Sequence, residues 1–164
     1  MKRWIALTTA LTLAALCLTA CAYADGETPP YTEVDFSKTD LNAAWDEEDA
    51  TRIVMQGESA EIAGGGASLA NGVLTISQPG DYVLTGAFAG SVVVDVGKEE
   101  KARLILCGVE IHSKNAPAIY VKSADKAVLT LADGTVNSLS DTDDYALAQG
   151  EDEPNACLFA KEDL

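Results

Sequence analysis

Histidine and arginine are scarce in this sequence, and acidic residues far outnumber basic ones. His112 is the only histidine, so neither a Ser-His-Asp triad nor a histidine-based metal site has support. Eleven lysines and arginines stand against 26 aspartates and glutamates, which gives a formal net charge of −15. Because a chain of this charge is repelled by a phosphate backbone, we expect no nucleic acid partner. The excess of carboxylates suits divalent cations, or simply solubility.

Cysteine is also scarce, and helical periodicity is missing. Of the four cysteines, only Cys107 and Cys157 lie beyond the N-terminal region. Two are too few for a disulfide scaffold, although an exported chain permits a bridge between them. Cys107 lies in an apolar run, so we interpret it as a small buried side chain. No stretch of ten or more residues sustains a helical period, which favours an all-β fold.

The chain opens with two basic residues and a long uncharged stretch. Lys2 and Arg3 precede a largely apolar run over residues 4–24, which is the layout of a secretory signal peptide. About 20 uncharged residues can also span a bilayer. The four threonines of the run and its extreme N-terminal position favour a cleaved leader instead. We therefore expect an extracellular protein.

The sequence is compatible with two alternative cleavage sites. Residues 18–21, Leu-Thr-Ala-Cys, resemble a bacterial lipobox, which predicts a signal peptide over residues 1–20 and a lipid on Cys21. The membrane would then be reached through this lipid anchor only. Residues 22–24, Ala-Tyr-Ala, fit ordinary signal peptidase and predict a freely secreted chain. We favour the lipobox, and loss of its leader changes the formal charge to −17.

Turn residues and short β-branched runs divide the rest of the chain. Residues 21–40 are polar and contain Pro29-Pro30, which predicts an extended tether. The folded domain is expected over residues 41–164, long enough for a core of its own. Strands separated by turn signals are expected at residues 52–55, 73–77, 82–85, 92–96, 104–112, 118–122 and 128–131.

A repeat favours one β architecture over others. Residues 101–106 (Lys-Ala-Arg-Leu-Ile-Leu) match residues 126–131 (Lys-Ala-Val-Leu-Thr-Leu) at an offset of 25, and residues 92–94 echo 118–120 at an offset of 26. Such a period, built of strands and turns, is typical of a solenoid whose coils cover one another. We therefore place a parallel β-helix ahead of a jelly roll or other sandwich. The register points Leu104, Leu106, Ile111, Leu129, Leu131 and Val136 inward, and Ile105 and Thr130 outward.

Several ordered segments resemble a known bacterial family. They include residues 106–111 (Leu-Cys-Gly-Val-Glu-Ile), 115–122 (Asn-Ala-Pro-Ala-Ile-Tyr-Val-Lys), 131–141 and 151–159. The family is that of exported carbohydrate-binding domain proteins with a pectate-lyase-like β-helix, and the resemblance covers roughly residues 40–164. It implies a right-handed parallel β-helix, bound calcium, and binding of acidic polysaccharide such as polygalacturonate. Family members run on further, so the resemblance also implies a β-helix truncated at the C-terminus.

The densest acidic cluster is the candidate metal site. Calcium prefers six to eight oxygen ligands from carboxylates, amides and carbonyls. The candidate ligands are Asp141, Asp143, Asp144, Glu151, Asp152, Glu153 and Asn155. Their spacing matches no EF-hand, and a solvated acidic loop is the alternative.

A local reversal of charge marks the candidate sugar site. Residues 98–126 contain six basic and four acidic residues, and lysines stacked on adjacent coils can contact sugar carboxylates. The carbohydrate-binding candidates are Lys101, Arg103, Lys122, Lys126 and the outward aromatic Tyr120. Alternatively, the lysines solubilise turns and protect strand edges. Tyr82 and Tyr145 are weaker aromatic candidates, and Trp45 is expected to cap the stack of coils.

Three functions compete. The leading hypothesis is a non-catalytic cell-surface protein that binds acidic polysaccharide with the help of calcium. The second is a calcium-dependent pectate lyase, which needs a lysine or arginine base to remove the proton beside a uronate carboxylate. Arg52 and Arg103 are the only arginines beyond the leader, and neither lies in a recognisable catalytic motif. The third is a structural surface adhesin.

Overall fold

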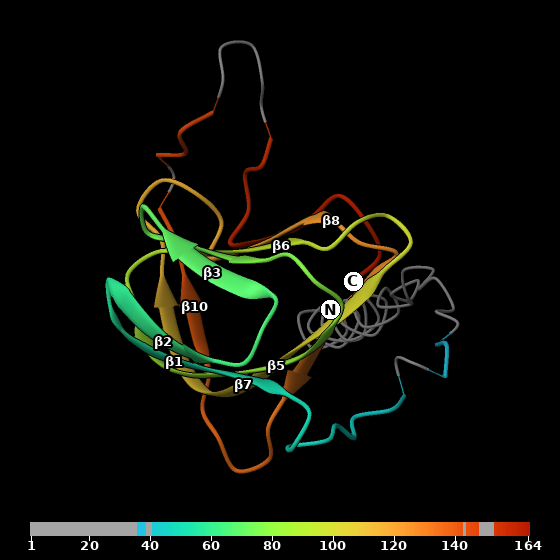
Figure 1. Ribbon diagram of the computed structural model, residues 1–164. Helices are drawn as coiled ribbons and strands as arrows, with labels where there is room; N and C mark the ends of the chain where they lie inside the picture. The colour runs from blue at the N-terminus through green and yellow to red at the C-terminus, as the bar shows by residue number, and fades with distance from the viewer. Residues whose placement is uncertain (1–35, 39–40, 143, 148–152) are drawn as a thin grey trace, which may run out of the picture. The chain divides into compact units, whose positions relative to one another are not determined.

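Strands make up all the regular secondary structure of the described residues (Figure 1). The structure is a computed structural model that describes residues 36–38, 41–142, 144–147 and 153–164. Cys21, with the expected leader and nearly all of the expected tether, lies outside this part. The strands are β1 (Thr51–Gly57), β2 (Ser59–Ala63), β3 (Ala67–Ala70), β4 (Val73–Ile76), β5 (Gly80–Phe88), β6 (Ser91–Asp95), β7 (Lys101–His112), β8 (Ile119–Ser123), β9 (Lys126–Leu131), β10 (Ser138–Ser140) and β11 (Leu158–Ala160). The described residues contain no helix of the length and apolarity that crossing a membrane requires.

Each of the seven strand predictions is confirmed, with ends that differ by a few residues. The sequence reading missed β2, β3, β10 and β11. The missed β3 forms a hairpin with β4 through Asn71-Gly72, whose φ angles are 51° and 76°. Two positive φ angles in a two-residue loop are the conformation that Asn-Gly favours in hairpins, so this dipeptide was an available signal.

The strands form two sheets between which the chain alternates. Sheet A has the order β10-β7-β5-β1-β2, with β9 also paired to β7, and sheet B has the order β11-β8-β6-β4-β3. From β4 to β8 each strand lies in the sheet opposite to the one before it. Neighbours within a sheet are therefore not consecutive in sequence, and they run parallel. The hairpins β1–β2 and β3–β4 are the antiparallel exceptions.

The register confirms the 25-residue repeat and corrects its continuation. Lys101 pairs with Lys126 and Leu104 with Leu129, as the offset of 25 predicts. In sheet B the offset is 27 instead of 26, because Val92 pairs with Ile119. Ile111 pairs with Leu139, 28 residues on, because residues 132–137 form a turn between β9 and β10. The repeat is thus constant in the strands and variable in the turns.

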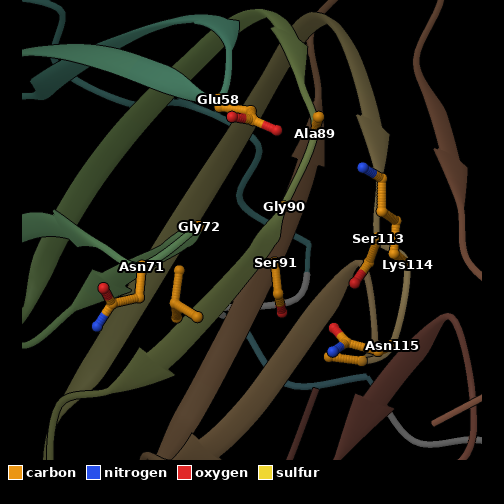
Figure 2. A pocket seen from close by; sticks show the side chains of 11 residues that line it. Glu58, Asn71, Gly72, Ala89, Gly90, Ser91, Ser113, Lys114 and Asn115 are labelled. Carbon is orange, nitrogen blue, oxygen red and sulfur yellow. The ribbon is translucent and has the colours of Figure 1, made fainter. Parts of the chain in front are cut away.

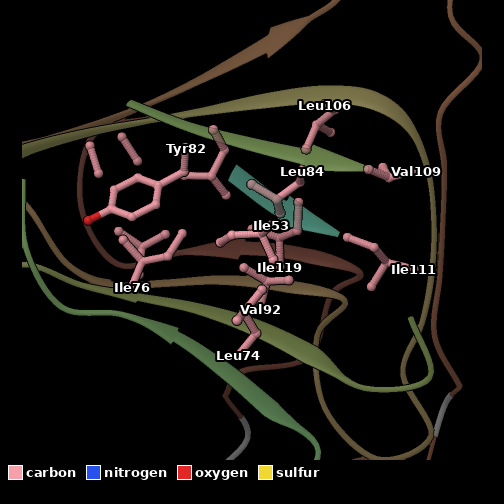
Figure 3. Close-up of a cluster of buried hydrophobic side chains, with 14 of the residues drawn as sticks. Ile53, Leu74, Ile76, Tyr82, Leu84, Val92, Leu106, Val109, Ile111 and Ile119 are labelled. Carbon is pink, nitrogen blue, oxygen red and sulfur yellow. The ribbon is translucent and has the colours of Figure 1, made fainter. Parts of the chain in front are cut away.

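The core lies between the two sheets (Figure 3). Alternate residues of each strand face it, since successive side chains of a strand point to opposite faces. In β6, for example, Val92 and Val94 are fully buried while Val93 lies on the outer side. The prediction for Leu104, Leu106 and Ile111 is confirmed, as all three are buried in this core. Leu129 packs against the same core and is half-buried.

Four residues differ from the predictions in their exposure to solvent. Leu131 and Val136 were expected inside but are 64% and 87% exposed. Leu131 ends β9, which has only β7 as a neighbour among the described strands, and Val136 lies in the turn that follows. Ile105 and Thr130 were expected to point outward, and they are nevertheless only 0% and 8% exposed. Ile105 does lie on the outer face of sheet A, where another part of the chain covers it.

A β-bulge keeps both halves of β7 in the core. Leu84 pairs with Leu106 but Gly86 pairs with Val109, so β7 carries one extra residue at this point. Gly108 has a φ of 73° there, a conformation that glycine adopts without steric cost. Without the extra residue the alternation would turn Val109 and Ile111 outward. The bulge therefore explains how the whole of this 12-residue strand contributes to one core.

Candidate functional site

The outer face of sheet A is partly occupied by the segment that precedes β1. Ala50 of this segment packs with Val83 and Ile105 in a second apolar cluster, which Trp45 and Cys107 border. Trp45 therefore covers the outer face of sheet A, and the expectation that it caps the stack is wrong. Cys107 is half-buried beside this cluster, and its thiol is free, as is that of Cys157.

Three of the five predicted sugar contacts belong to sheet A. The Lys101 ammonium lies 3.4 Å from the Asp125 carboxylate, and Lys101 stacks on Lys126 in the register. Arg103 donates through Nη1 to the Ala44 carbonyl, so its guanidinium holds the N-terminal segment. Its Nε is buried and has no hydrogen-bond partner among the described residues. Lys101 and Arg103 line a shallow pocket of about 220 Å³ that also includes Asp81.

Sheet B presents an outer face with two aromatic rings. A row across this face runs through Thr75, Val93, Tyr120 and Phe159, which are register partners on β4, β6, β8 and β11. Tyr120 and Phe159 are half-buried, and their ring centroids lie 5.8 Å apart with an interplanar angle of 61°. This edge-to-face contact is a favourable arrangement of aromatic quadrupoles. The two rings therefore support each other while each keeps part of its surface in solvent.

A lysine stands two residues after each of these rings, Lys122 after Tyr120 and Lys161 after Phe159. Lys122, two residues after Tyr120 on the same side of β8, places its Nζ 2.7 Å from Asp95 Oδ2. This hydrogen bond to Asp95 raises the pKa of the Lys122 ammonium, which is charged at neutral pH. Lys161 follows β11 directly, is exposed, and its backbone N–H donates to the Val121 carbonyl. We refer to Tyr120, Phe159, Lys122 and Lys161 as the aromatic–lysine platform.

The platform combines the two chemistries that an acidic sugar needs. The apolar face of an aromatic ring packs against the C–H groups of a sugar ring, while an ammonium pairs with a carboxylate. Sequence reasoning identified Tyr120 and Lys122 but missed Phe159 and Lys161, because β11 was not expected. The alternation in Leu158-Phe159-Ala160, where Leu158 and Ala160 pack against the core, was the signal that could have found Phe159.

The acidic segment after β10 is only partly described. Asp143, Glu151 and Asp152 lie outside the described residues, whereas Asp144, Glu153 and Asn155 are exposed. Asp141 accepts a hydrogen bond from the Tyr145 hydroxyl, which raises the pKa of Tyr145 to about 12. Burial and then the Asp141 charge raise the pKa of the Cys157 thiol. The Tyr145 hydroxyl is therefore engaged with a carboxylate, and its side chain is half-buried.

The described part of the candidate metal site does not assemble a set of ligands. No three His, Cys, Asp or Glu side chains of the described residues come together in the manner of a metal site. Tyr82, the remaining aromatic candidate, is 2% exposed and donates its hydroxyl to the Gln78 carbonyl over 2.7 Å. It is a core residue, and its candidacy as a sugar platform is wrong.

Comparison with known proteins points to a family. The sequence profile described as "Carbohydrate-binding domain-containing protein" matches residues 70–164. A protein of Acetivibrio thermocellus with the same description is 39% identical over 101 residues, which are 60% of this chain and 35% of that protein. The chain thus spans about a third of the length of the curated relative that it matches.

A solved structure supports the same relationship. It is described as the polysaccharide lyase-like protein from C. thermocellum, as a gadolinium derivative. It matches this fold with a TM-score of 0.66 and 34% sequence identity, over 70% of this chain and 47% of that chain. This chain, an all-β fold of parallel-rich sheets, thus resembles the structure of a lyase-like protein. The carbohydrate-binding-domain profile covers more than half of the sequence. The chain therefore belongs to the family of carbohydrate-binding domain-containing proteins.

Proposed function

We propose that this protein is a non-catalytic, cell-surface binder of acidic polysaccharide of the polygalacturonate type. The observation that carries the proposal is the aromatic–lysine platform, in which two half-buried rings pack edge to face on sheet B and each is followed two residues later by a lysine. Membership of a carbohydrate-binding family supplies the class of ligand. The platform supplies the preference for negative charge within that class.

Charge makes such a local site necessary. The chain carries a formal charge of −15, so its contact with a polyanion is repulsive on average. The charge of Lys122 is neutralised by the ion pair with Asp95. Lys161 has no partner among the described side chains and is exposed. The platform with Asp95 therefore keeps one net positive charge. That charge can pair with a uronate carboxylate while the rings hold the sugar face.

We also propose that the parallel strands are coils of a right-handed parallel β-helix. Support comes from the alternation between sheets A and B and from the offsets of 25 and 27 residues between parallel neighbours. Parallel neighbours lie about 4.8 Å apart, so side chains at one register position form rows across the coils. A row of this kind suits an extended polymer, whose sugar residues repeat along its length.

Calcium assistance is part of the proposal. The solved relative is described as a gadolinium derivative, and gadolinium is a hard cation that prefers oxygen ligands, as calcium does. In this chain the described members of the candidate set do not fit a calcium site, since Asp141 is engaged by Tyr145 and the others do not gather around it. The platform itself contains none of these carboxylates. The dependence of binding on calcium is measured with chelator in the gel assay below.

A lyase is the second candidate, because the solved relative is described as polysaccharide lyase-like. The reaction requires a base that removes the proton beside the uronate carboxylate. Neither described arginine suits this role: Arg52 lies 3.0 Å from the Glu47 carboxylate, and Arg103 binds the Ala44 carbonyl. The two arginines therefore give no support to a lyase, and we place binding without turnover first because of the platform.

Affinity electrophoresis in gels that contain polygalacturonate tests the proposal. We expect the wild type to be retarded, and Tyr120→Ala and Lys161→Gln to lose most of the retardation. Lys101→Gln is the matched control, since Lys101 is a lysine on the other sheet that is already paired with Asp125. Each variant is first shown to be folded by its thermal unfolding. Equal retardation of Lys161→Gln and Lys101→Gln would refute the platform.

Changes of chelator, salt and polymer, together with a measurement of product, distinguish the competing functions. Retardation that is lost with chelator supports calcium bridging, whereas retardation that survives chelator but weakens with salt supports the lysines. A neutral cellulose-like polymer should be held less well than polygalacturonate. Absorbance of an unsaturated uronate product on mixing with the polymer would establish a lyase. Folded protein that shows neither retardation nor product would leave the structural adhesin as the function.

A further inference from the structure

A cleft lies at the end of the sheets where the chain crosses from one strand to the next (Figure 2). Four turns contribute to it, those after β1, β3, β5 and β7, and its volume is about 190 Å³. Its polar lining residues are Glu58, Asn71, Ser91, Ser113, Lys114 and Asn115. None of them belongs to the aromatic–lysine platform, so the cleft is a separate feature of the molecule.

Four exposed side chains around the cleft have no partner among the described residues. They are the Glu58 carboxylate, the Lys114 ammonium, and the amides of Asn71 and Asn115. Figure 2 shows that Glu58 and Lys114 approach from opposite sides, with Asn71 and Asn115 on the two sides further down. The set offers acceptors on the carboxylate, donors on the ammonium, and both on each amide.

The floor of the cleft is built from glycine and buried serine. A Cβ at Gly90 would lie 2.2 Å from the Gly72 carbonyl oxygen, so these two turns approach closely through their backbones. The Ser91 hydroxyl, 4% exposed, donates to the Pro117 carbonyl over 2.6 Å and fixes the turn after β7 against the turn after β5. The rim side chains are thus mounted on a backbone that packing holds in place.

We propose that this cleft is a second carbohydrate site, which takes a single neutral pyranose residue by its hydroxyl groups. The negative charge of the Glu58 carboxylate and the positive charge of the Lys114 ammonium cancel, so the rim has no net preference for an anion. No aromatic side chain lines the cleft, and recognition therefore runs through the hydroxyl edge of the sugar and not through stacking. The volume is below the roughly 300–1,000 Å³ of pockets for drug-sized ligands, which fits one ring.

Adjacent hydroxyls of a pyranose complement this rim. Glu58 can accept from two neighbouring hydroxyls, Lys114 can donate to a third, and the amides can do either. Hydrogen bonds to charged groups are stronger than those between neutral groups, so Glu58 and Lys114 are expected to contribute more than the two amides. A uronate carboxylate would be attracted by Lys114 and repelled by Glu58 within the same small cleft, so it gains no net affinity over a neutral sugar. The cleft therefore does not share the preference for an acidic sugar that we propose for the platform.

Saturation-transfer NMR with the full chain tests this proposal, with methyl galactopyranoside and methyl glucopyranoside as neutral probes and methyl galacturonate as the acidic one. We expect transfer to at least one neutral probe, and a Kd about tenfold higher for Glu58→Ala, as the loss of a hydrogen bond to a charged group predicts. Asn115→Ala should weaken binding in the same direction. Glu61→Ala is the matched control, because Glu61 is an exposed glutamate of the same hairpin outside the cleft.

Each outcome bears on this site independently of the platform. Tyr120→Ala, which is expected to lose polygalacturonate, should bind the neutral probe as the wild type does. Equal affinities of Glu58→Ala and Glu61→Ala would overturn the proposal, as would tighter binding of methyl galacturonate than of both neutral probes. Absence of transfer to both neutral probes, with a chain whose thermal unfolding shows it to be folded, would overturn it as well.

Discussion

Leu106 and Leu131 occupy equivalent positions of the sequence repeat but differ in their exposure to solvent. They are register partners on β7 and β9, and the sequence repeat treats them as equivalent. Leu106 is 1% exposed and Leu131 is 64% exposed. The difference arises because β7 has neighbours on both sides, β5 and β9, whereas β9 has only β7 among the described strands.

This pair gives a matched test of the register. Leu106→Ala should lower the free energy of unfolding by about 2–5 kcal/mol, through lost apolar burial and the cavity left behind. Leu131→Ala should change it by no more than about 0.5 kcal/mol, as is usual for surface substitutions. Chemical denaturation of both variants measures the difference. Similar losses for the two would contradict the exposed position of Leu131.

Cys157 gives a pH-dependent test at the same scale. Burial first, and then the negative charge of Asp141, raise the pKa of its thiol. Since the thiolate is the reactive form, Cys157 should be alkylated slowly by iodoacetamide at pH 8 and faster as the pH rises. Asp141→Asn should increase the rate at pH 8, because removal of the charge lowers the thiol pKa.

Mass spectrometry of the peptide that contains Cys157 measures this rate separately from the other cysteines. Asp144→Asn is the control, since Asp144 is an exposed aspartate of the same segment and is not among the causes of the Cys157 shift. If both aspartate variants accelerate alkylation equally, the specific influence of Asp141 is refuted.

The segment before β1 has no regular secondary structure, yet it determines how much of the outer face of sheet A is buried. Residues 44–50 contribute Trp45 and Ala50 to a cluster over Val83 and Ile105, and Arg103 binds the Ala44 carbonyl. This contact turns a face of sheet A that alternation assigns to solvent into a buried one. It also engages Nη1 of the Arg103 guanidinium, so this donor is no longer available to a sugar.

Loss of the Arg103 contact should loosen this segment. Arg103→Met is expected to raise the rate of chymotrypsin cleavage at Trp45 several-fold, because a hydrogen bond from a charged donor no longer holds the segment closed. Lys101→Met, two residues away on the same strand and paired with Asp125, is the matched control. The cleavage rates are compared by electrophoresis over time. Equal rates for the two variants would show that Arg103 does not anchor the segment.

At the scale of the whole molecule, we propose that a lipid on Cys21 holds the protein at the outer side of the membrane. The motive is the sequence Leu18-Thr19-Ala20-Cys21 after a charged start and an apolar run. Metabolic labelling with a fatty acid in a bacterial host should mark the wild type and not Cys21→Ser. Equal labelling of both chains, or a mature N-terminus at Asp25, would refute lipidation and favour secretion.

The sequence by itself determined the all-β class, seven strands and the 25-residue register between β7 and β9. These features are local, because alternation and turn residues act over a few positions and a repeat compares the chain with itself. The family resemblance also came from ordered local segments, and the family profile agrees with it. Tyr120 and Lys122 were found for the same reason, as outward residues of a recognisable strand.

Only the tertiary structure decided which outer faces are open and which side chains meet there. Phe159 joins Tyr120 from 39 positions away because β11 adds to β8, and the cleft brings together Glu58 from the turn after β1 and Lys114 from the turn after β7. Ile105 is buried and Leu131 exposed because of what packs over each, not because of its place in a strand. Covering a surface requires contacts between distant parts of the chain, and alternation along one strand carries no information about them.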